Sequence, residues 1–215
     1  VGRESDSELA DGLAEITHAS RRAADLTNQL LAYTRRGTSQ DAPVDVNEIV
    51  NDVADAIGLH AGQALTVTRN LCQGSPVVMG DGGQIHEAIF NLAVNAAEAM
   101  PGGGELALAT EIVAAEESGR DRPEADQPGR YIRVSVTDTG VGMDSETLDH
   151  IFEPFFTTKP AGEAVGLGLA VVYGCARDHK GNVLVDSRPN HGTTVKLFLP
   201  LREDDAIAAE PDASA

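Results

Sequence analysis

Oxygen-bearing side chains recur at helical spacing in the segment 86–100, HEAIFNLAVNAAEAM. Glu87, Asn91 and Asn95 stand at i, i+4 and i+8, and Glu98 follows at i+11, so a helix places them on one face. Asparagine is a poor helix former, and two of them inside an apolar helix need polar partners. A hard cation such as Mg²⁺ takes oxygen ligands together with waters and substrate phosphates. The segment alone is equally consistent with a cation site and with asparagines bonded to neighbouring backbone.

A second candidate is the acid in VSVTDTGVGM, residues 134–143. Asp138 stands at the C-terminal end of an apolar strand pattern and precedes Gly140 and Gly142. A carboxylate there can accept a hydrogen bond from the amino group of a flat ligand, and the glycines permit close approach. An aspartate in an ordinary turn has the same appearance.

An anion site is predicted in VGLGLAVVYG, residues 165–174, where Gly166 and Gly168 open a helix. Free N–H groups and the helix dipole attract an anion at such a position. Lys159, in the polar loop just before, could reach the same anion. The sequence contains neither G-x-x-x-x-G-K-[ST] nor a strand-to-helix G-x-G-x-x-G, so this phosphate site belongs to another architecture.

Hydrophobic periodicity and turn residues predict the elements that would position these groups. Helices are expected at 47–59, 82–99 and 167–178, and strands at 64–71, 76–81, 104–114 and 130–138, with a closing hairpin at 181–200. A short hinge is expected at 37–43, and a loop of unusual length at 115–129.

The N-terminal part reads as one long helix over 7–36. Leu9, Leu13 and Ile16 begin a narrow apolar stripe that needs a partner helix to be buried. The acidic, small-residue tail is expected to be disordered or a linker. We therefore divide the chain into an N-terminal helical part (1–40), a compact domain (41–201) and a tail (202–215).

Composition restricts the partners and the compartment. The net charge of −18 argues against nucleic acid and anionic membrane as main partners. The two cysteines lack metal-ligand spacing, which suits a reducing compartment. No apolar run approaches the roughly 20 residues that cross a bilayer. We expect a cytoplasmic location, within a larger membrane-linked sensor or without one.

The order of four motifs is more specific than any of them alone. Four segments occur in the order NLAVNAAEAM, DTGVGM, FEPFFTTK and GLGLAVVYG. They resemble the N, G1, F and G2 boxes of the histidine-kinase branch of the superfamily that also contains gyrase and the heat-shock ATPase chaperone. The resemblance covers residues 41–200 and is greatest to the nitrogen-regulator-like and hybrid subset. It implies an α+β fold, a two-layer α/β sandwich with a mixed sheet packed on helices (the Bergerat ATP-binding fold), preceded by one long N-terminal helix.

The resemblance also implies roles for individual residues. Asp138 would accept from the adenine amino group of ATP with Thr193 helping through water, Asn95 would hold Mg²⁺ beside Asn91, and Lys159 would contact phosphate. Phe152, Phe155 and Phe156 would anchor a lid over 152–166. The implied nucleotide-binding set is Asn91, Asn95, Asp138, Gly140, Gly142, Phe155, Thr157, Thr158, Lys159, Gly166, Leu167, Gly168, Leu169 and Thr193.

Kinase activity is favoured over hydrolysis within this superfamily. Hydrolysing relatives carry a water-activating glutamate four residues before the magnesium asparagine, and here that position is Asn91. Without a positioned base, attack by water is slow. The catalytic candidates are Asn91, Lys159 and Glu87, which lies one turn further back.

The phosphoacceptor is expected outside this chain. The N-terminal helix resembles the second helix of the family's dimerisation and phosphotransfer hairpin, and His18 has no adjacent acid. The implied partners are a helix bearing the phosphoacceptor histidine, a response regulator or receiver domain, and a second copy of the chain. Alternatives are a nucleotide-binding regulator with decayed kinase activity, or a serine kinase or ATPase of the superfamily. Ala164 and Val165 replace a glycine and a threonine usual in relatives, and Glu98 replaces a frequent lysine.

Overall fold

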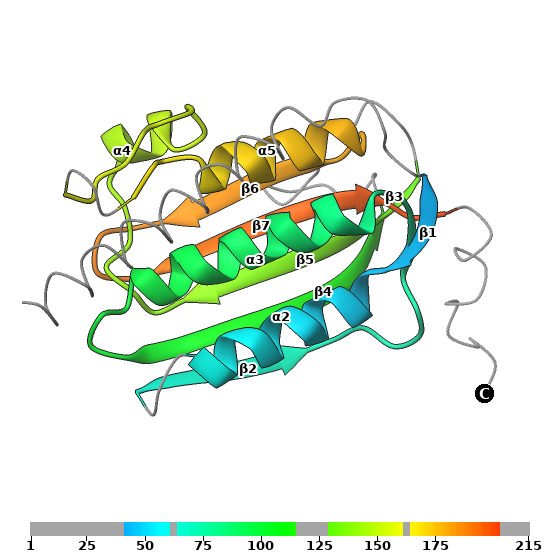
Figure 1. Cartoon of the computed structure of the whole chain (residues 1–215), viewed down its shortest axis with the longest axis horizontal. Helices are drawn as coiled ribbons and strands as arrows, with labels where there is room; N and C mark the ends of the chain where they lie inside the picture. Colours follow the sequence, from blue (N-terminus) through cyan, green and yellow to red (C-terminus); the bar gives the residue numbers. More distant parts are fainter. Residues whose placement is uncertain (1–40, 61–63, 115–128, 161–163, 203–215) are drawn as a thin grey trace, which may run out of the picture. The chain divides into compact units, whose positions relative to one another are not determined.

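The structure, a computed structural model, describes residues 41–60, 64–114, 129–160 and 164–202 (Figure 1). The predicted helix at 7–36, most of the long loop after residue 114 and nearly all of the tail lie outside the described residues, as do residues 161–163 of the predicted lid.

A five-stranded mixed sheet forms one layer of the domain. Its order is β2 (Leu65–Asn70), β4 (Gly104–Ala114), β5 (Arg130–Asp138), β7 (Thr193–Pro200) and β6 (Asn182–Ser187). β2 runs parallel to β4, and every other neighbouring pair is antiparallel. The predicted strands and closing hairpin are therefore confirmed, and so is the mixed character of the sheet.

Helices α2 (Val46–His60), α3 (Gly82–Glu98) and α5 (Gly168–Asp178) lie side by side over one face of this sheet (Figure 1). Helix α3 buries the apolar stripe expected from its spacing, namely Ile85, Ala88, Ile89, Leu92, Ala93 and Ala96. These side chains join sheet residues such as Leu106, Leu108, Val134 and Leu197 in one core whose fully buried members are all aliphatic or sulfur-containing. Burial of this apolar surface is what holds the two layers together.

Polar contacts fix how α3 begins. Asp81 caps the helix, because its Oδ1 accepts from Gly83 N at 2.9 Å and from Gln84 N at 3.2 Å. The N–H of Asp81 donates to His179 Nε2 at 3.0 Å, and His179 Nδ1 in turn donates to the Cys175 carbonyl at 2.8 Å. The start of α3 is thereby tied to the end of α5, which sets the relative position of the two helices that carry candidate site residues.

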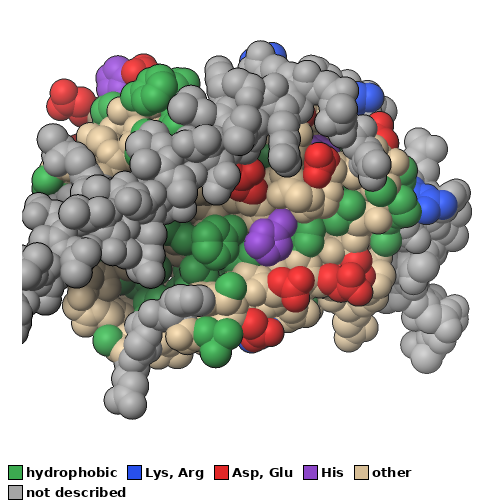
Figure 2. All heavy atoms as spheres, in the orientation of Figure 1, with side chains coloured by type: hydrophobic (Ala, Val, Ile, Leu, Met, Phe, Trp, Pro, Cys, Tyr) green, Lys and Arg blue, Asp and Glu red, His purple; other side chains and the backbone are tan. Residues whose placement is uncertain are grey.

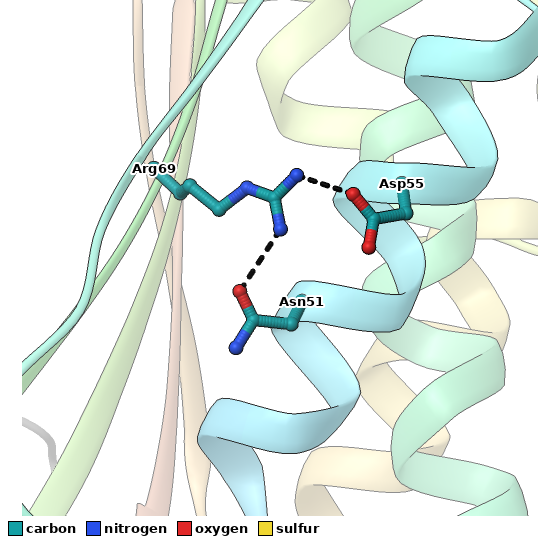
Figure 3. A network of polar contacts seen from close by, with 3 residues as sticks. All are labelled: Asn51, Asp55 and Arg69. Carbon is teal, nitrogen blue, oxygen red and sulfur yellow. Dashed lines mark hydrogen bonds and ion pairs between the residues drawn. The ribbon is translucent and has the colours of Figure 1, made fainter.

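Polar contacts also hold α2 against the sheet. Arg69 on the edge strand β2 donates to Asn51 Oδ1 at 3.0 Å and forms an ion pair with Asp55, both on α2 (Figure 3). Deeper in, Thr110 Oγ1 on β4 donates to Asn47 Oδ1 at 2.7 Å and accepts from Cys72 N at 2.9 Å.

Acidic side chains gather over α2 and α3 on the face that Figure 2 shows, in line with the strongly negative net charge.

Two elements differ from the sequence-based expectation. The predicted hinge at 37–43 is wrong for its last two residues, which belong to the strand β1 (Ala42–Asp45). β1 pairs antiparallel with β3 (Val77–Gly80) in a small second sheet. That pairing joins segments more than 30 residues apart, so no local periodicity signals it. A short helix, α4 (Ser145–His150), was not expected, because none of its residues is buried and its only signal is Asp144, which caps it by accepting from Thr147 N at 2.8 Å.

Among the described residues, no helix combines the length and the apolar character that crossing a membrane requires.

Candidate functional site

Asp138 is the last residue of β5 and is nearly fully buried. Its Oδ1 accepts from Gly140 N at 2.7 Å and from Thr193 N at 3.2 Å. Burial raises the pKa of the Asp138 carboxyl above its ordinary value, and these two backbone N–H groups oppose that rise. Both hydrogen bonds end on Oδ1, so within the described part of the chain Oδ2 is the oxygen that remains to accept from a ligand.

The glycines that follow Asp138 are required by the protein's own backbone. A Cβ atom on Gly140 would lie 2.6 Å from the Ala99 carbonyl oxygen, and one on Gly142, where φ is +63°, would lie 2.0 Å from the Arg188 carbonyl oxygen. The sequence suggested that glycine at these positions admits a ligand, and the structure gives a different reason for glycine there. Without a side chain, the turn after β5 can pass between the end of α3 and the β6–β7 turn.

Ser187 supports the same corner and was not found from the sequence. Its Oγ accepts from Met143 N at 2.9 Å and donates to the Gly192 carbonyl at 3.1 Å. The Ser187 and Thr193 hydroxyls lie 2.9 Å apart, and since Ser187 has used its only proton, Thr193 is the donor. Thr193 pairs with Asp138 across β5 and β7, so its hydroxyl is held beside the buried acid.

Asn91 and Asn95 face the beginning of α5. A Cβ atom on Gly168 would lie 3.3 Å from Asn95 Nδ2 and 3.5 Å from Asn91 Oδ1, so both amides lie against the first residue of that helix. Both asparagines are half-buried, and so is Glu87, one turn earlier on α3. The structure thus brings the asparagine pair and the predicted anion-binding helix start together, although they are more than 70 residues apart in the chain.

The turn before α5 is shaped by Gly166, whose φ is +71°. A Cβ atom there would lie 2.4 Å from the Phe156 carbonyl oxygen, and Phe155 N donates to the Gly166 carbonyl at 2.8 Å. The buried Leu167 stands at the N-cap of α5 and makes no capping hydrogen bond through its side chain. The half-buried Leu169 follows in the first turn, whose backbone N–H groups have no partner within the helix.

Lys159 is brought to the far end of α3. Its ammonium forms an ion pair with Glu98, and its backbone N–H donates to Thr157 Oγ1 at 3.2 Å. Thr157 and Thr158 are both exposed. The sequence marked Glu98 only as a reversed charge, and its pairing with Lys159 is a contact between residues 61 positions apart.

The three phenylalanines expected to anchor the lid differ from one another. The Phe152 ring lies 5.4 Å from the Tyr173 ring on α5, and the Phe156 ring lies 5.6 Å from the His150 ring on α4. Phe155 is 65% exposed and has a positive φ, so most of its side chain faces solvent and little of it is packed against the described residues. Its attachment is the backbone hydrogen bond to Gly166.

The described residues include no group of three or more histidine, cysteine or acidic side chains placed to hold a metal ion. Cys175 is also unsuited to nucleophilic chemistry, because burial raises the pKa of its thiol to about 12. Asn91 and Asn95 supply amide oxygens that lie against the first residue of α5.

Comparison with known proteins accounts for this arrangement. Residues 80–203 match the family described as histidine kinase-, DNA gyrase B- and HSP90-like ATPases. The chain is 38% identical over 216 residues to the sensor kinase CckA of Brucella abortus, covering 96% of this chain and 22% of that protein. It is 32% identical over 195 residues to the sensor histidine kinase ZraS of Escherichia coli, covering 91% of this chain and 34% of that protein.

The fold agrees with these matches. The mycobacterial sensor histidine kinase MprB superposes with a TM-score of 0.61 at 25% identity, over 75% of this chain and 98% of the solved one. The chain spans about a fifth to a third of the length of the two curated relatives. It belongs to the family of histidine kinase-, DNA gyrase B- and HSP90-like ATPases, and its compact domain is of the ATP-binding type found in sensor histidine kinases.

Proposed function

We propose that this chain is the ATP-binding catalytic portion of a two-component sensor histidine kinase, transferring the γ-phosphoryl group of ATP to a histidine on another helix. One observation carries the proposal. The buried Asp138 and the Asn91–Asn95 pair, which faces the start of α5, lie on the strand and helix that form the two layers of one domain. An adenine acceptor and a phosphate-binding region are then supplied by the same structural unit.

At the adenine end, Asp138 Oδ2 accepts from the amino group of the base. The Gly140 and Thr193 N–H groups hold the carboxylate through Oδ1, so its orientation exists before the ligand arrives. The Thr193 hydroxyl, oriented by Ser187, stands beside it and contacts the base through water. Gly140 and Gly142 contribute by fixing the turn that closes this end.

At the phosphate end, the backbone from Gly166 to Leu169 binds the phosphates, assisted by Lys159 and by the exposed Thr157 and Thr158. Mg²⁺ fits the residues present: the donors are amide oxygens, which a hard cation prefers, and a side chain at Gly168 would fill the space that the amides face. Asn95 would hold the ion with Asn91 beside it. The ion would supply neutralisation of phosphate charge.

The residues favour transfer over hydrolysis. Asn91 occupies the position where a water-activating carboxylate is expected in hydrolysing relatives, and an amide cannot accept a proton. Glu87, one turn earlier than Asn91, is an acid on the same face of α3 that could assist an incoming nucleophile. Phosphoryl transfer then depends on positioning and charge neutralisation.

The partners follow from the same proposal. The phosphoryl acceptor is a histidine on a separate helix, and a response regulator or receiver domain takes the group onward. The apolar stripe of 7–36 supports self-association, so we propose a homodimer through that segment. Free cysteines at 72 and 175 and the use of ATP are consistent with a cytoplasmic location.

The experiment is transfer in trans. The chain is mixed with a separate polypeptide carrying the relatives' phosphoacceptor helix and with radiolabelled ATP·Mg²⁺. Acid-labile, base-stable phosphate on that polypeptide is expected, and it should disappear when the acceptor histidine is replaced by glutamine. Tight ATP binding with no transfer would instead favour a nucleotide-binding regulator, the alternative to which Ala164 and Val165 before α5 point.

A further inference from the structure

Glu98 is the last residue of α3, and its carboxylate forms an ion pair with the ammonium of Lys159. Both side chains are partly exposed, at 46% for Glu98 and 33% for Lys159. The pair joins the end of α3 to the segment 152–160 that precedes α5. Since solvent reaches both partners, an anion arriving from solution can reach Lys159 as well.

The position of this pair matters because of what else shares its side of α3. Asn91, Asn95 and Glu98 stand at i, i+4 and i+7, so they lie along one face. This face points at the start of α5, because the Asn91 and Asn95 amides lie against Gly168. The ion pair therefore lies about one turn beyond the asparagine pair, beside the region where the proposed function places the phosphates.

We propose that Glu98 is a specificity-determining residue for the phosphate chain of the nucleotide, and this inference rests on the proposed function. The carboxylate competes with phosphate for the Lys159 ammonium, and it repels phosphate charge directly. Both effects make the binding free energy of the nucleotide less favourable, and both grow with the charge on the phosphates. Glu98 therefore weakens binding of ATP and leaves binding of adenosine unchanged.

The expected effect is modest, because partly exposed ion pairs are weak. Replacing Glu98 by glutamine should tighten ATP binding by about two- to fivefold. The gain should be smaller for ADP and absent for adenosine. High salt should reduce the difference between the variant and the wild-type chain, because exposed charges are screened.

The test is calorimetric titration of the whole chain with ATP, ADP and adenosine in the presence of Mg²⁺. The variants are Glu98→Gln, Lys159→Gln and the double substitution. Glu111→Gln is the matched control: it also removes one negative charge and one ion pair, that with Arg133, and residue 111 lies on the sheet face opposite the helices. The control should leave all three affinities unchanged.

The inference is supported if Glu98→Gln tightens ATP binding, spares adenosine and has a smaller effect in the Lys159→Gln background. It is overturned if ATP binding is unchanged or weaker, which would mean that Glu98 is inert or holds Lys159 in place for phosphate. An equal change for adenosine would also overturn it. A wild-type chain that binds no ATP refutes the proposed function itself, whereas normal wild-type binding with an inert Glu98→Gln refutes this inference alone.

Discussion

Replacing Asp138 by asparagine changes one oxygen of a buried carboxylate into an amide nitrogen and keeps the shape of the side chain. Oδ1 of the amide can still accept from Gly140 N and Thr193 N, which bond that oxygen at 2.7 and 3.2 Å. The NH₂ group must then take the place of Oδ2. It meets the adenine amino group donor to donor, so the hydrogen bond that we propose cannot form.

The magnitude follows from two contributions. A hydrogen bond to a charged acceptor stabilises a complex by about 1.5–3 kcal/mol, and leaving a buried donor without a partner costs about 1–3 kcal/mol. Together they predict a loss of about 2.5–6 kcal/mol in binding. ATP affinity should therefore fall by about 10²- to 10⁴-fold.

The fold should tolerate the change. Burial raises the folded-state pKa of Asp138 above its unfolded value, so its contribution to stability is fully present below the unfolded pKa and is lost as pH rises through the folded pKa. As pH rises, ionisation of the buried carboxyl therefore becomes a cost to folding that the neutral amide does not carry. The free energy of unfolding of Asp138→Asn at pH 7 should stay close to that of the wild-type chain, because loss of the buried charge offsets the cost of the unpaired amide NH₂.

Calorimetry with ATP·Mg²⁺ and urea unfolding measure the two quantities on the same preparations. Asp52→Asn, an exposed acid on α2, is the control for loss of one negative charge and should change neither. Unchanged ATP affinity in Asp138→Asn would show that the adenine site lies elsewhere. Lost affinity with a clearly lowered unfolding free energy would refute the argument about burial.

Three further perturbations test the fold and the site. Thr110→Val should lower the unfolding free energy by about 2–3 kcal/mol in urea titrations, because it leaves Asn47 Oδ1 and the N–H of Cys72 without their partner; a loss below about 0.5 kcal/mol would contradict this. Gly168→Ala should weaken ATP binding about tenfold without lowering stability, since its Cβ would lie against both asparagine amides while alanine favours the helix; equal affinity by calorimetry would argue against phosphates at that position. The carboxyl carbon of Asp138 should titrate above pH 3.8 by NMR, because burial raises its pKa, and a midpoint below that value would contradict the burial argument.

Local chemistry made most of the fold predictable. Helix α3 could be placed because its apolar residues recur at helical spacing and Asp81 is a strong cap, and both signals lie within one segment. The strand β5 was recognisable because β-branched apolar residues alternate with polar ones along it up to Asp138. The strand β1 was not, since its four residues become a strand by pairing with β3.

The candidate site was predictable in its parts and not in its connections. The asparagines on α3, the acid at the end of β5 and the glycines around the start of α5 stand out because their types are unusual for their elements. Ser187 carries no such signal: it is an ordinary strand residue until the fold sets it beside Thr193 and the Met143 N–H. The family resemblance implied that Phe155 anchors the lid, yet this residue is largely exposed.

By itself, the sequence determined most of the elements, with β1 and α4 as the exceptions, and the order in which the site motifs occur along them, because periodicity, capping and motif spacing act over a few neighbouring residues. Only the tertiary structure decided that Asn91 and Asn95 face Gly168 and that Glu98 forms an ion pair with Lys159. It also decided that position 142 must be glycine, because the Arg188 carbonyl leaves no room for a Cβ atom there. Each of these contacts joins residues more than 40 positions apart. Such contacts depend on how helices and strands pack around a shared core, which no local pattern encodes.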